Sequence, residues 1–395
     1  MSPMRIALVT RRFWPLVGGA ESLVASLAAG LRSQDVQPQV VTARWDTEWP
    51  RQVTLREVPV TRLPHPTPRG WGTLRYIIAL GRWLRRHRTE LDVVYVSMLK
   101  HDAYAAVRAL RGSRAPVVLR VEGGGRTGDI HWQQTAAFGS RIKRRCLTAD
   151  AIVAPSPPLV EELIDAGYPS ERVVQINNGV PLGPVRDLPA RRAARTMLTD
   201  LNWELNSSES TPVIVYTGRL HRDKGLEHLV RSFKQVIQRW RHARLWLVGV
   251  GPERGNLVDL VHVLDLRGKV VLPGLFSDAE AVLAAADVFV LPSRQEGMSI
   301  SLLEAMGIGL PVVASDIPGN RAVIRHDEHG LLTPFGDPAA LAQAINRLLE
   351  NRQLAHTLAA AARARVENEF SIARCAREHI ALFSRLIAAK SSPPT

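Results

Sequence analysis

Short apolar, β-branched runs alternate along the chain with longer segments in which apolar residues recur every three or four positions. This pattern predicts strands alternating with helices, which is typical of a mostly parallel α/β sheet. Strands in the first half are predicted at Arg5–Thr10, Gln39–Thr42, Asp92–Val96, Pro116–Val121, Ala151–Ala154 and Val173–Ile176. Strand-like runs in the second half begin at Pro212, Arg244, Val270, Asp287 and Val312. The fold class is therefore α/β, with one doubly wound sheet expected in each half.

The domain boundaries are placed where this alternation is interrupted. Residues 1–182 are expected to form an N-terminal Rossmann-like domain, and residues 211–370 a C-terminal one. The intervening segment, residues 183–210, is polar with one short helical stretch, and we interpret it as a linker. A chain of 395 residues with 46% apolar residues is long enough to bury two cores.

Cysteine usage and the absence of long apolar runs indicate a cytoplasmic protein. Two cysteines, Cys146 and Cys375, exclude a disulfide-based scaffold. The apolar run Ile6–Thr10 is too short for a signal peptide or a membrane span and predicts a first buried strand instead.

The charge is strongly basic and unevenly distributed. The formal net charge is +14, and residues 1–185 carry 25 Lys and Arg against 15 Asp and Glu. An anionic partner of the first half is therefore expected: nucleic acid, an anionic membrane surface or a phosphorylated acceptor. No nucleic-acid-binding motif accompanies the arginines, so nucleic acid is disfavoured.

Residues 72–88 predict a basic amphipathic helix. At 100° per residue, one face carries Tyr76, Leu80, Trp83 and Leu84, and the opposite face carries Arg75, Arg82 and Arg86. Two interpretations stand side by side: a helix packed on the core with a solvated charged face, or peripheral attachment to anionic lipid.

Two carboxylates follow a buried strand in the segment from Leu291 to Asp316. Glu296 lies in the loop after the strand, and Glu304 lies in the short helix that follows, where Ser301 to Glu304 has the pattern of a capping box. The amides of Gly297, Met298 and Ser299 lie near the N-terminus of that helix, which favours an anionic group. Ligands of open α/β sheets bind at this carboxyl edge.

A loop with two cations follows the first strand of the second half. Arg219 and Lys224 lie five residues apart, after a strand and before an apolar-periodic helix. A guanidinium offers phosphate oxygens a bidentate fork, and an ammonium offers a mobile point charge. The alternative is a solvated charged turn.

The first half carries weaker candidates at the same kind of edge. Gly18 and Gly19 follow the first strand without forming a G-x-G-x-x-G fingerprint, so a dinucleotide site is disfavoured. Glu122 ends a strand before a glycine-rich loop, with Asp129 and His131 farther along.

The strings PSRQEGMSISLLEAMGIGLPVVASD and GRLHRDKG resemble the signature of retaining, nucleotide-sugar-dependent glycosyltransferases of family 4. The resemblance implies a GT-B fold, in which two Rossmann-like domains face each other across a cleft and a C-terminal helix, here about residues 371–389, packs back on the first domain. It implies that Arg219 and Lys224 bind the donor diphosphate, together with Gly297 and Met298 and the loop of Gly18 and Gly19.

Further roles follow from the same resemblance. Glu296 is expected to hold hydroxyls of the donor sugar, with Gly297, Met298 and Ser299 beside it, and Glu304 to hold the ribose. Glu122 stands where the family has a His, and either stabilises a cationic transition state or accepts the proton of the acceptor. Asp129 and His131 are the alternatives for that role, and Asn178 of the Asn-Gly-Val hinge is a candidate contact to sugar or acceptor.

The expected reaction is transfer of a hexose-type sugar from a nucleoside diphosphate sugar to a hydroxyl of a saccharide or lipid-linked acceptor, in exopolysaccharide or cell-envelope assembly. No cofactor is expected, and because the chain has no D-x-D pair, no metal site either. A nucleotide-sugar 2-epimerase and a non-catalytic sugar-nucleotide-binding protein are the alternatives.

Overall fold

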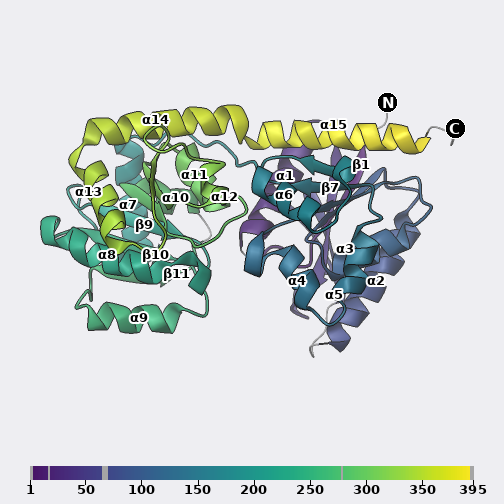
Figure 1. The fold of residues 1–395 in the computed structure, drawn as a ribbon, viewed down its shortest axis with the longest axis horizontal. Helices are drawn as coiled ribbons and strands as arrows, with labels where there is room; N and C mark the ends of the chain where they lie inside the picture. The colour runs from purple at the N-terminus through teal and green to yellow at the C-terminus, as the bar shows by residue number, and fades with distance from the viewer. Residues whose placement is uncertain (1–2, 17, 65–69, 277–278, 392–395) are drawn as a thin grey trace. The chain divides into compact units, whose positions relative to one another are not determined.

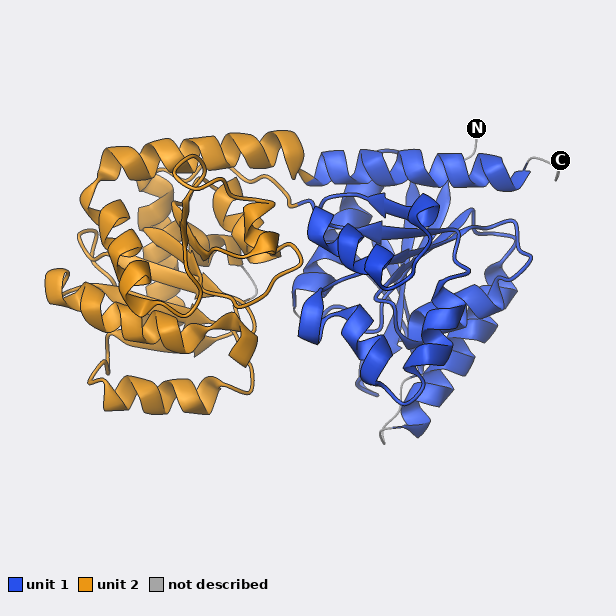
Figure 2. Cartoon of the chain, viewed as in Figure 1, with its two compact units in different colours: residues 1–179, 372–395 blue, residues 180–371 orange. Residues whose placement is uncertain are grey.

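The computed structural model describes residues 3–16, 18–64, 70–276 and 279–391, and the chain forms two compact units (Figure 2). Unit 1 comprises residues 1–179 and 372–395, and unit 2 comprises residues 180–371. Each unit is an α/β sandwich around one sheet (Figure 1).

Unit 1 contains an eight-stranded sheet in the order β3-β4-β2-β1-β5-β6-β7-β8. Its strands are β1 (Arg5–Val9), β2 (Gln37–Arg44), β3 (Gln52–Leu55), β4 (Val58–Pro64), β5 (Val93–Ser97), β6 (Val117–Arg120), β7 (Ala151–Ala154) and β8 (Val173–Gln175). All neighbours pair in parallel except β3 with β4. All six strands predicted in this half are therefore present.

The hairpin of β3 and β4 was not predicted. Its turn is formed by Arg56 and Glu57, both with positive φ (49° and 63°), in place of the Asn-Gly or Asp-Gly pair that makes such turns recognisable. β3 is half-buried or exposed throughout, so it also lacks an apolar run.

Helices cover both faces of the unit 1 sheet. One core cluster lies under α1 (Gly19–Arg32) and α15 (Ile372–Ser391), which pack against each other. The other lies under α2 (Trp71–His87), α3 (His101–Ala109), α4 (Asp129–Thr135), α5 (Gly139–Cys146) and α6 (Pro157–Asp165). The unit also contains two short 3-10 helices. η1 (Gly125–Thr127) precedes α4, and η2 (Ser170–Arg172) follows α6.

Unit 2 contains a six-stranded parallel sheet in the order β11-β10-β9-β12-β13-β14. Its strands are β9 (Val213–Thr217), β10 (Arg244–Val248), β11 (Val270–Gly274), β12 (Val288–Leu291), β13 (Val312–Ser315) and β14 (Leu331–Thr333). Its helices are α7 (Leu188–Leu201), η3 (Trp203–Leu205), η4 (Arg222–Lys224), α8 (Leu226–Arg239), α9 (Arg254–Val263), α10 (Ala279–Ala285), α11 (Ile300–Gly307), α12 (Pro318–Arg321), α13 (Pro338–Glu350) and α14 (Arg352–Glu369).

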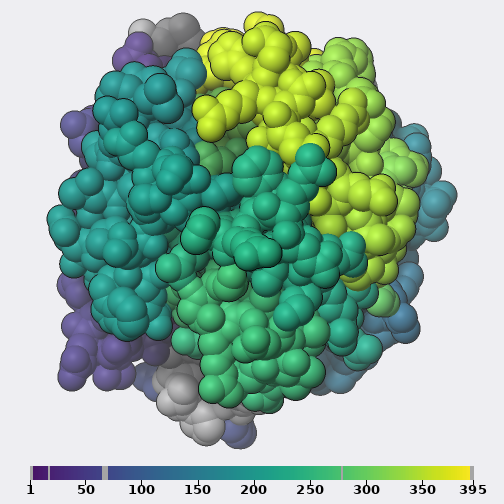
Figure 3. Space-filling model, turned by 90° about the vertical axis from the view of Figure 1, so that its left-hand side faces the viewer, coloured from purple at the N-terminus to yellow at the C-terminus, as the bar shows by residue number. Residues whose placement is uncertain are grey.

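Residues 183–210, which we interpreted as a linker, belong to unit 2. Helix α7 packs against α10, and Leu198 and Leu205 are completely buried in the core of the unit. Arg195 of α7 is buried too and donates to Asp287 at 2.9 Å. The polar residues that suggested a linker thus lie on the outer face of a packed helix. Figure 3 shows the space-filling surface of unit 2, whose segments are coloured teal to yellow.

Helix α2 has the face that its periodicity predicted. Tyr76, Leu80 and Leu84 are fully buried against the sheet, and Arg82 and Arg86 are exposed. Among the described residues, no helix is both long and apolar enough to cross a membrane.

Candidate active site

The loops that carry the strongest motifs leave two adjacent strands of unit 2, β9 and β12. The chain runs from β9 outward to β10 and β11, and from β12 in the opposite direction to β13 and β14. The two strands therefore flank the point where the direction of winding reverses, and ligands of doubly wound sheets bind at the carboxyl edge there.

The loop after β9 is held against the loop after β12. Gly225 has a left-handed backbone (φ 60°), and a Cβ there would lie 2.2 Å from the carbonyl oxygen of Pro292, so only glycine fits. The amide of Arg294 donates to the carbonyl of Asp223 at 2.8 Å. Tyr216 donates its hydroxyl to the carbonyl of Arg219 at 2.9 Å and so braces the start of the loop.

This packing brings Lys224 and Glu296 together. The ammonium Nζ lies 2.6 Å from Oε1 of Glu296, and both side chains are largely buried. Arg219 lies on the exposed part of the same loop. Two of the residues predicted for diphosphate and sugar binding are therefore in direct contact.

Helix α11 begins two residues earlier than the predicted capping box requires. Ser299 is its N-cap and accepts from the amide of Leu302 at 3.4 Å, with Ser301 inside the helix. Glu304 therefore lies in the second turn and does not cap the helix. The predicted capping box was wrong, because the N-cap is Ser299 and the residue three positions later is Leu302, which has no side chain to bond back to the cap.

Glu304 is half-buried in an environment that disfavours its charge. Burial, followed by the nearby carboxylate of Glu280, raises the pKa of Glu304 to about 7. A carboxyl group poised near neutrality, away from a capping role, is available to a polar ligand. Glu280 was not among the sequence candidates, because its proximity to Glu304 depends on how α10 packs.

Glu122, in unit 1, forms an ion pair with a buried arginine. Arg120 ends β6, is almost completely buried, and contacts both Glu122 and the side-chain oxygen of Asn178. Ser97 donates to Glu122 at 2.6 Å. Burial lowers the pKa of Arg120, but Glu122 together with Tyr95 and Cys375 outweighs burial and raises that pKa above its ordinary value. Asn178, predicted to contact sugar or acceptor, thus bonds to Arg120.

Asp129 and His131 occupy different positions relative to Glu122. Asp129 is buried, accepts the amide of Glu122 at 2.9 Å and pairs with Lys100 at 3.6 Å. Burial raises the pKa of Asp129, and Lys100 opposes that shift. His131 is two residues farther along α4, about 200° around the helix from Asp129.

Gly18 and Gly19 lie where α1 begins. Gly18 is the N-cap with an extended backbone, and a Cβ on it would lie 2.3 Å from the carboxylate of Glu21. Glu21 pairs in turn with Arg12 at 3.3 Å. Val17 of the same loop is outside the described residues.

Arg120, Ser97 and Lys100 are polar neighbours that the sequence analysis missed. The signal for Arg120 was present: a cation at the end of an apolar strand run needs a buried anionic partner. Across the residues that the structure describes, no group of three or more His, Cys, Asp or Glu side chains is placed to hold a metal ion.

Comparison with known families identifies the chain. Residues 17–183 match the model described as Glycosyltransferase Family 4, and residues 211–351 the model described as Glycosyl transferases group 1. The chain belongs to glycosyltransferase family 4.

Relatives of this family 4 glycosyltransferase include an uncharacterized glycosyltransferase of Methanocaldococcus jannaschii, 26% identical over 366 residues, which cover 88% of this chain and 90% of that protein. The lipopolysaccharide core biosynthesis glycosyltransferase LpsD of Rhizobium meliloti is 34% identical over 185 residues, 47% of this chain and 53% of its own length.

The fold is GT-B, as in solved family structures. HepE of Anabaena, in complex with UDP-glucose, superposes with a TM-score of 0.79 and 21% identity, covering 97% of this chain and 100% of that one. At this identity the similarity establishes the fold of the family 4 glycosyltransferase. Its substrates have to be inferred from the residues of the site.

Proposed function

We propose that this family 4 glycosyltransferase transfers a hexose-type sugar, with retention, from a nucleoside diphosphate sugar to an acceptor hydroxyl. The observation that carries the proposal is the contact of Lys224 with Glu296, on the two loops at the reversal point of the unit 2 sheet, with Arg219 on the same loop as Lys224. Because HepE binds UDP-glucose on the same fold, UDP-glucose is the first donor to test.

Each part of such a donor has a candidate partner. Arg219 and Lys224 supply positive charge for the diphosphate, and the loop of Gly18 and Gly19 contributes backbone. The sugar is assigned to Glu296 with Gly297, Met298 and Ser299, and the ribose to Glu304. A carboxylate can accept hydrogen bonds from two vicinal hydroxyls, which suits both the sugar ring and the ribose of the donor.

The chemistry follows from the charges. When the bond between the anomeric carbon and the diphosphate breaks, negative charge grows on the leaving group, where the Arg219 guanidinium and Lys224 ammonium stabilise it. Glu122, ion-paired with Arg120, is the candidate to stabilise positive charge on the sugar or to accept the proton of the acceptor hydroxyl. The cations make a metal clamp unnecessary, so we expect metal-independent transfer.

The acceptor is proposed to be a saccharide or lipid-linked saccharide of exopolysaccharide or cell-envelope assembly, made on the cytoplasmic side of the membrane. LpsD, which acts in lipopolysaccharide core biosynthesis, supports this setting. Helix α2 supports a peripheral membrane contact, because its exposed surface carries an apolar stripe of Trp71, Leu74 and Ile78 beside its arginines.

The test is thermal unfolding with UDP, GDP, ADP and dTDP, each with and without EDTA. A ligand at 100 times its dissociation constant adds about 2.7 kcal/mol to the free energy of unfolding, enough for a clear shift in Tm. We expect a shift with one nucleotide that EDTA does not change and that Arg219→Ala removes. No shift with any nucleotide would refute the proposal.

Product analysis separates the remaining enzyme classes. Incubation with the donor alone should leave the sugar configuration unchanged, since an epimerase needs no acceptor. Transfer to added saccharide acceptors should yield the α- or β-linkage that matches the donor, which distinguishes retention from inversion.

A further inference from the structure

An ion pair of unit 1 lies where two neighbouring strands end. Ser97 is the last residue of β5 and lies opposite Arg120, the last residue of β6, in the parallel pairing of these strands. Glu122 follows Arg120 by two residues, and alternate residues of an extended chain point to the same side. The carboxylate of Glu122 therefore meets both the guanidinium of Arg120 and the hydroxyl of Ser97.

Arg120 is enclosed, while Glu122 reaches the surface. The side chain of Arg120 is 2% exposed, whereas that of Glu122 is 13% exposed. Tyr95 of β5 and Cys375 of α15 are buried, and both act on the charge of Arg120. A guanidinium enclosed in this way acts on the reaction through Glu122 and not on the substrate itself.

Glu122 is held at one of its two carboxylate oxygens. The contact with Arg120 and the hydrogen bond from Ser97, at 2.6 Å, are both made to Oε1. The amide of Glu122 also donates to Asp129 at 2.9 Å, which fixes the backbone at this residue. Among the residues that the structure describes, no side chain or amide donates a hydrogen bond to Oε2. Oε2 is therefore the oxygen left for a ligand.

The buried guanidinium needs a negative charge beside it. Its other terminal nitrogen, Nη2, contacts the side-chain oxygen of Asn178, which is neutral. Burial lowers the pKa of Arg120, and Glu122 with Tyr95 and Cys375 raises that pKa above its ordinary value. Protonating Glu122 would leave a buried cation without its counter-ion, which is strongly destabilising. The arrangement therefore favours a carboxylate that keeps its charge throughout the reaction.

We propose that Arg120 is a positioning residue, which holds Glu122 as a fixed anion. Through Oε2 this anion stabilises positive charge on the donor sugar, and Glu122 does not accept the proton of the acceptor. An anion that is already oriented stabilises a developing charge without reorganising. The inference rests on the proposed transfer reaction and decides between the two roles considered there for Glu122.

The transfer step balances without a proton acceptor on the protein. The bond between the anomeric carbon and the diphosphate oxygen breaks, and its electron pair stays on the diphosphate. The acceptor oxygen forms a new bond to the anomeric carbon. Its proton passes to the diphosphate, which is the group that gains negative charge.

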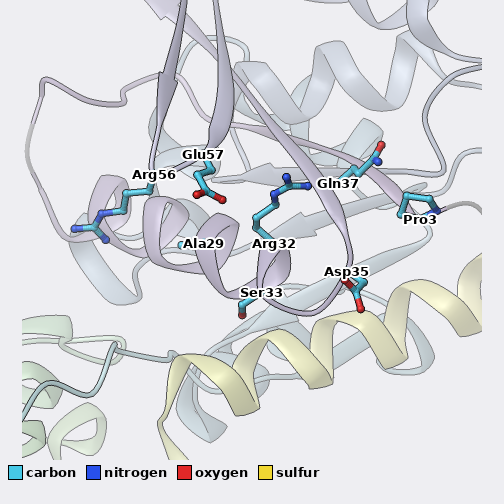
Figure 4. Close-up of a pocket in the computed structure, with 8 residues that line it drawn as sticks. All are labelled: Pro3, Ala29, Arg32, Ser33, Asp35, Gln37, Arg56 and Glu57. Atoms are coloured by element: carbon cyan, nitrogen blue, oxygen red, sulfur yellow. The ribbon is translucent and has the colours of Figure 1, made fainter.

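The larger cavity of unit 1 is a poorer candidate for a further functional site. It has about 900 Å³ and lies at the amino edge of the sheet, between the end of α1 and the hairpin of β3 and β4. Its arginines, Arg32 and Arg56, point in different directions in Figure 4, and Asp35 and Glu57 balance their charge.

A smaller cavity of unit 1 has its charges already compensated. It is lined by a cluster of three basic side chains, Arg11, Lys100 and His101. The buried carboxylate of Asp102 lines the same cavity, and Lys100 pairs with buried Asp129 at 3.6 Å. The cluster therefore needs no further anion.

The first experiment compares kcat with donor affinity in two variants of Arg120. Arg120→Met is expected to lower kcat on the order of 10²-fold, because Glu122 loses the contact that orients it. The Kd for UDP-glucose should stay unchanged, because Arg120 does not touch the ligand. Arg120→Lys keeps a cation without the planar fork and should recover part of the lost kcat.

Arg172→Met is the matched control for lost stability. Arg172 precedes β8 at the amino edge of the same sheet and donates to the carbonyls of Leu147 and Ala149 at 3.1 Å each. Its replacement should lower Tm and leave kcat unchanged. An equal loss of kcat in Arg172→Met and Arg120→Met would overturn the proposal, and so would a wild-type kcat in Arg120→Met.

The second experiment combines Arg120→Met with Glu122→Gln. Replacing both charges leaves no buried ion alone, so the double variant keeps the test open if Arg120→Met fails to fold. We expect the double variant to have the same kcat as Glu122→Gln, because Arg120 acts through Glu122. A further loss in the double variant would overturn the proposal, as would a wild-type kcat in Glu122→Gln.

A third experiment tests whether the loss in Glu122→Gln concerns a proton. Azide is a nucleophile that has no proton to lose, so a variant that lacks only a proton acceptor can still transfer glucose to it. We expect azide to leave the rate of UDP release by Glu122→Gln unchanged. Restoration of the wild-type rate, with glucosyl azide as the product, would overturn the proposal.

Failure of the proposed transfer reaction is recognised separately. A wild-type chain that transfers sugar from no nucleotide donor refutes the transferase proposal, whatever the variants do. A wild-type chain that transfers sugar, with a kcat that does not depend on Arg120, refutes the positioning role alone.

Discussion

Lys224 and Glu296 illustrate how two loops are joined into one site. Each alone is a charged loop residue, but the packing of Gly225 against Pro292 places their side chains 2.6 Å apart in a largely buried position. A partly buried ion pair orients both groups, and removing one partner leaves the other poorly solvated. The two residues should therefore act as a unit on the donor.

A double-mutant cycle tests this coupling. Lys224→Met and Glu296→Gln are each expected to lower kcat/KM by about 10²–10³-fold, and the double variant by much less than the product. The coupling energy should lie at about 0.5–3 kcal/mol.

The matched control is Arg239 with Glu350, an exposed pair of the same unit at 2.8 Å. Arg239→Met and Glu350→Gln should leave kcat/KM unchanged, since exposed pairs contribute about 0–1 kcal/mol to stability. Additive effects of Lys224→Met and Glu296→Gln would contradict the assignment.

Glu304 should make donor binding depend on pH. In the proposed ribose role its carboxylate has to accept hydroxyls, and its pKa is raised to about 7. The affinity for UDP-glucose, whose diphosphate does not titrate near neutrality, is therefore expected to fall about tenfold for each pH unit below 7 and to level off above pH 8. Calorimetric titration between pH 5.5 and 8.5 measures this, and Glu304→Gln should flatten the curve.

The stability of the free chain should show the opposite trend. Because the pKa of Glu304 in the folded state is raised above its ordinary value, protonation favours folding. That contribution is present at low pH and is lost as the pH rises through about 7. A donor affinity independent of pH in the wild type would contradict the ribose role.

At the scale of elements, short turns position the active-site loops. The turn at η4 passes through Gly225 with φ 60°, in close contact with the carbonyl of Pro292. A side chain there would both strain the backbone and push the two loops apart, so the loop proposed to bind phosphate depends on one glycine.

Gly225→Ala is expected to lower the free energy of unfolding by about 1–3 kcal/mol and to weaken donor binding. Thermal unfolding with and without UDP measures both effects. Gly255→Ala is the control, because a Cβ on Gly255, in helix α9, meets nothing within 4 Å. Equal Tm values for the two variants would show that the contact of Gly225 is dispensable.

At the scale of the whole molecule, the basic first half presents a surface suited to anionic lipid. Trp71, Leu74 and Ile78 of α2 are 77%, 48% and 42% exposed, and Arg82, Arg85 and Arg86 continue the surface toward the end of the helix. The buried face of α2 packs against the core of unit 1. The exposed apolar stripe of the same helix is therefore not needed for folding.

Flotation with vesicles tests the membrane contact. We expect the wild-type chain to float with anionic vesicles and not with neutral ones, less so at high salt. Reversal of the three arginines to Glu, or Trp71→Ser, should abolish flotation. Trp203→Ser is the control, because Trp203 of unit 2 is as exposed, at 78%. Unchanged flotation after arginine reversal would refute the membrane contact.

The sequence by itself determined the local elements and the chemistry of the loops. Buried parallel strands need apolar runs, so β1, β2 and β5–β8 in unit 1 and β9–β13 in unit 2 were recognisable. Ligand loops need glycine and charge, and Arg219, Lys224 and Glu296 were predicted from that pattern. The hairpin of β3 and β4 was not predicted, because its turn lacks glycine and its edge strand β3 lacks an apolar run.

Only the tertiary structure decided which of these residues meet. The contact of Lys224 with Glu296, the bonds of Arg120 to Glu122 and Asn178, and the cluster of Arg11 with Lys100 and His101 all join loops from different strands. Their partners are set by the order of strands in the sheet. That order follows from burying whole faces of helices and strands, a property that no local stretch of sequence contains.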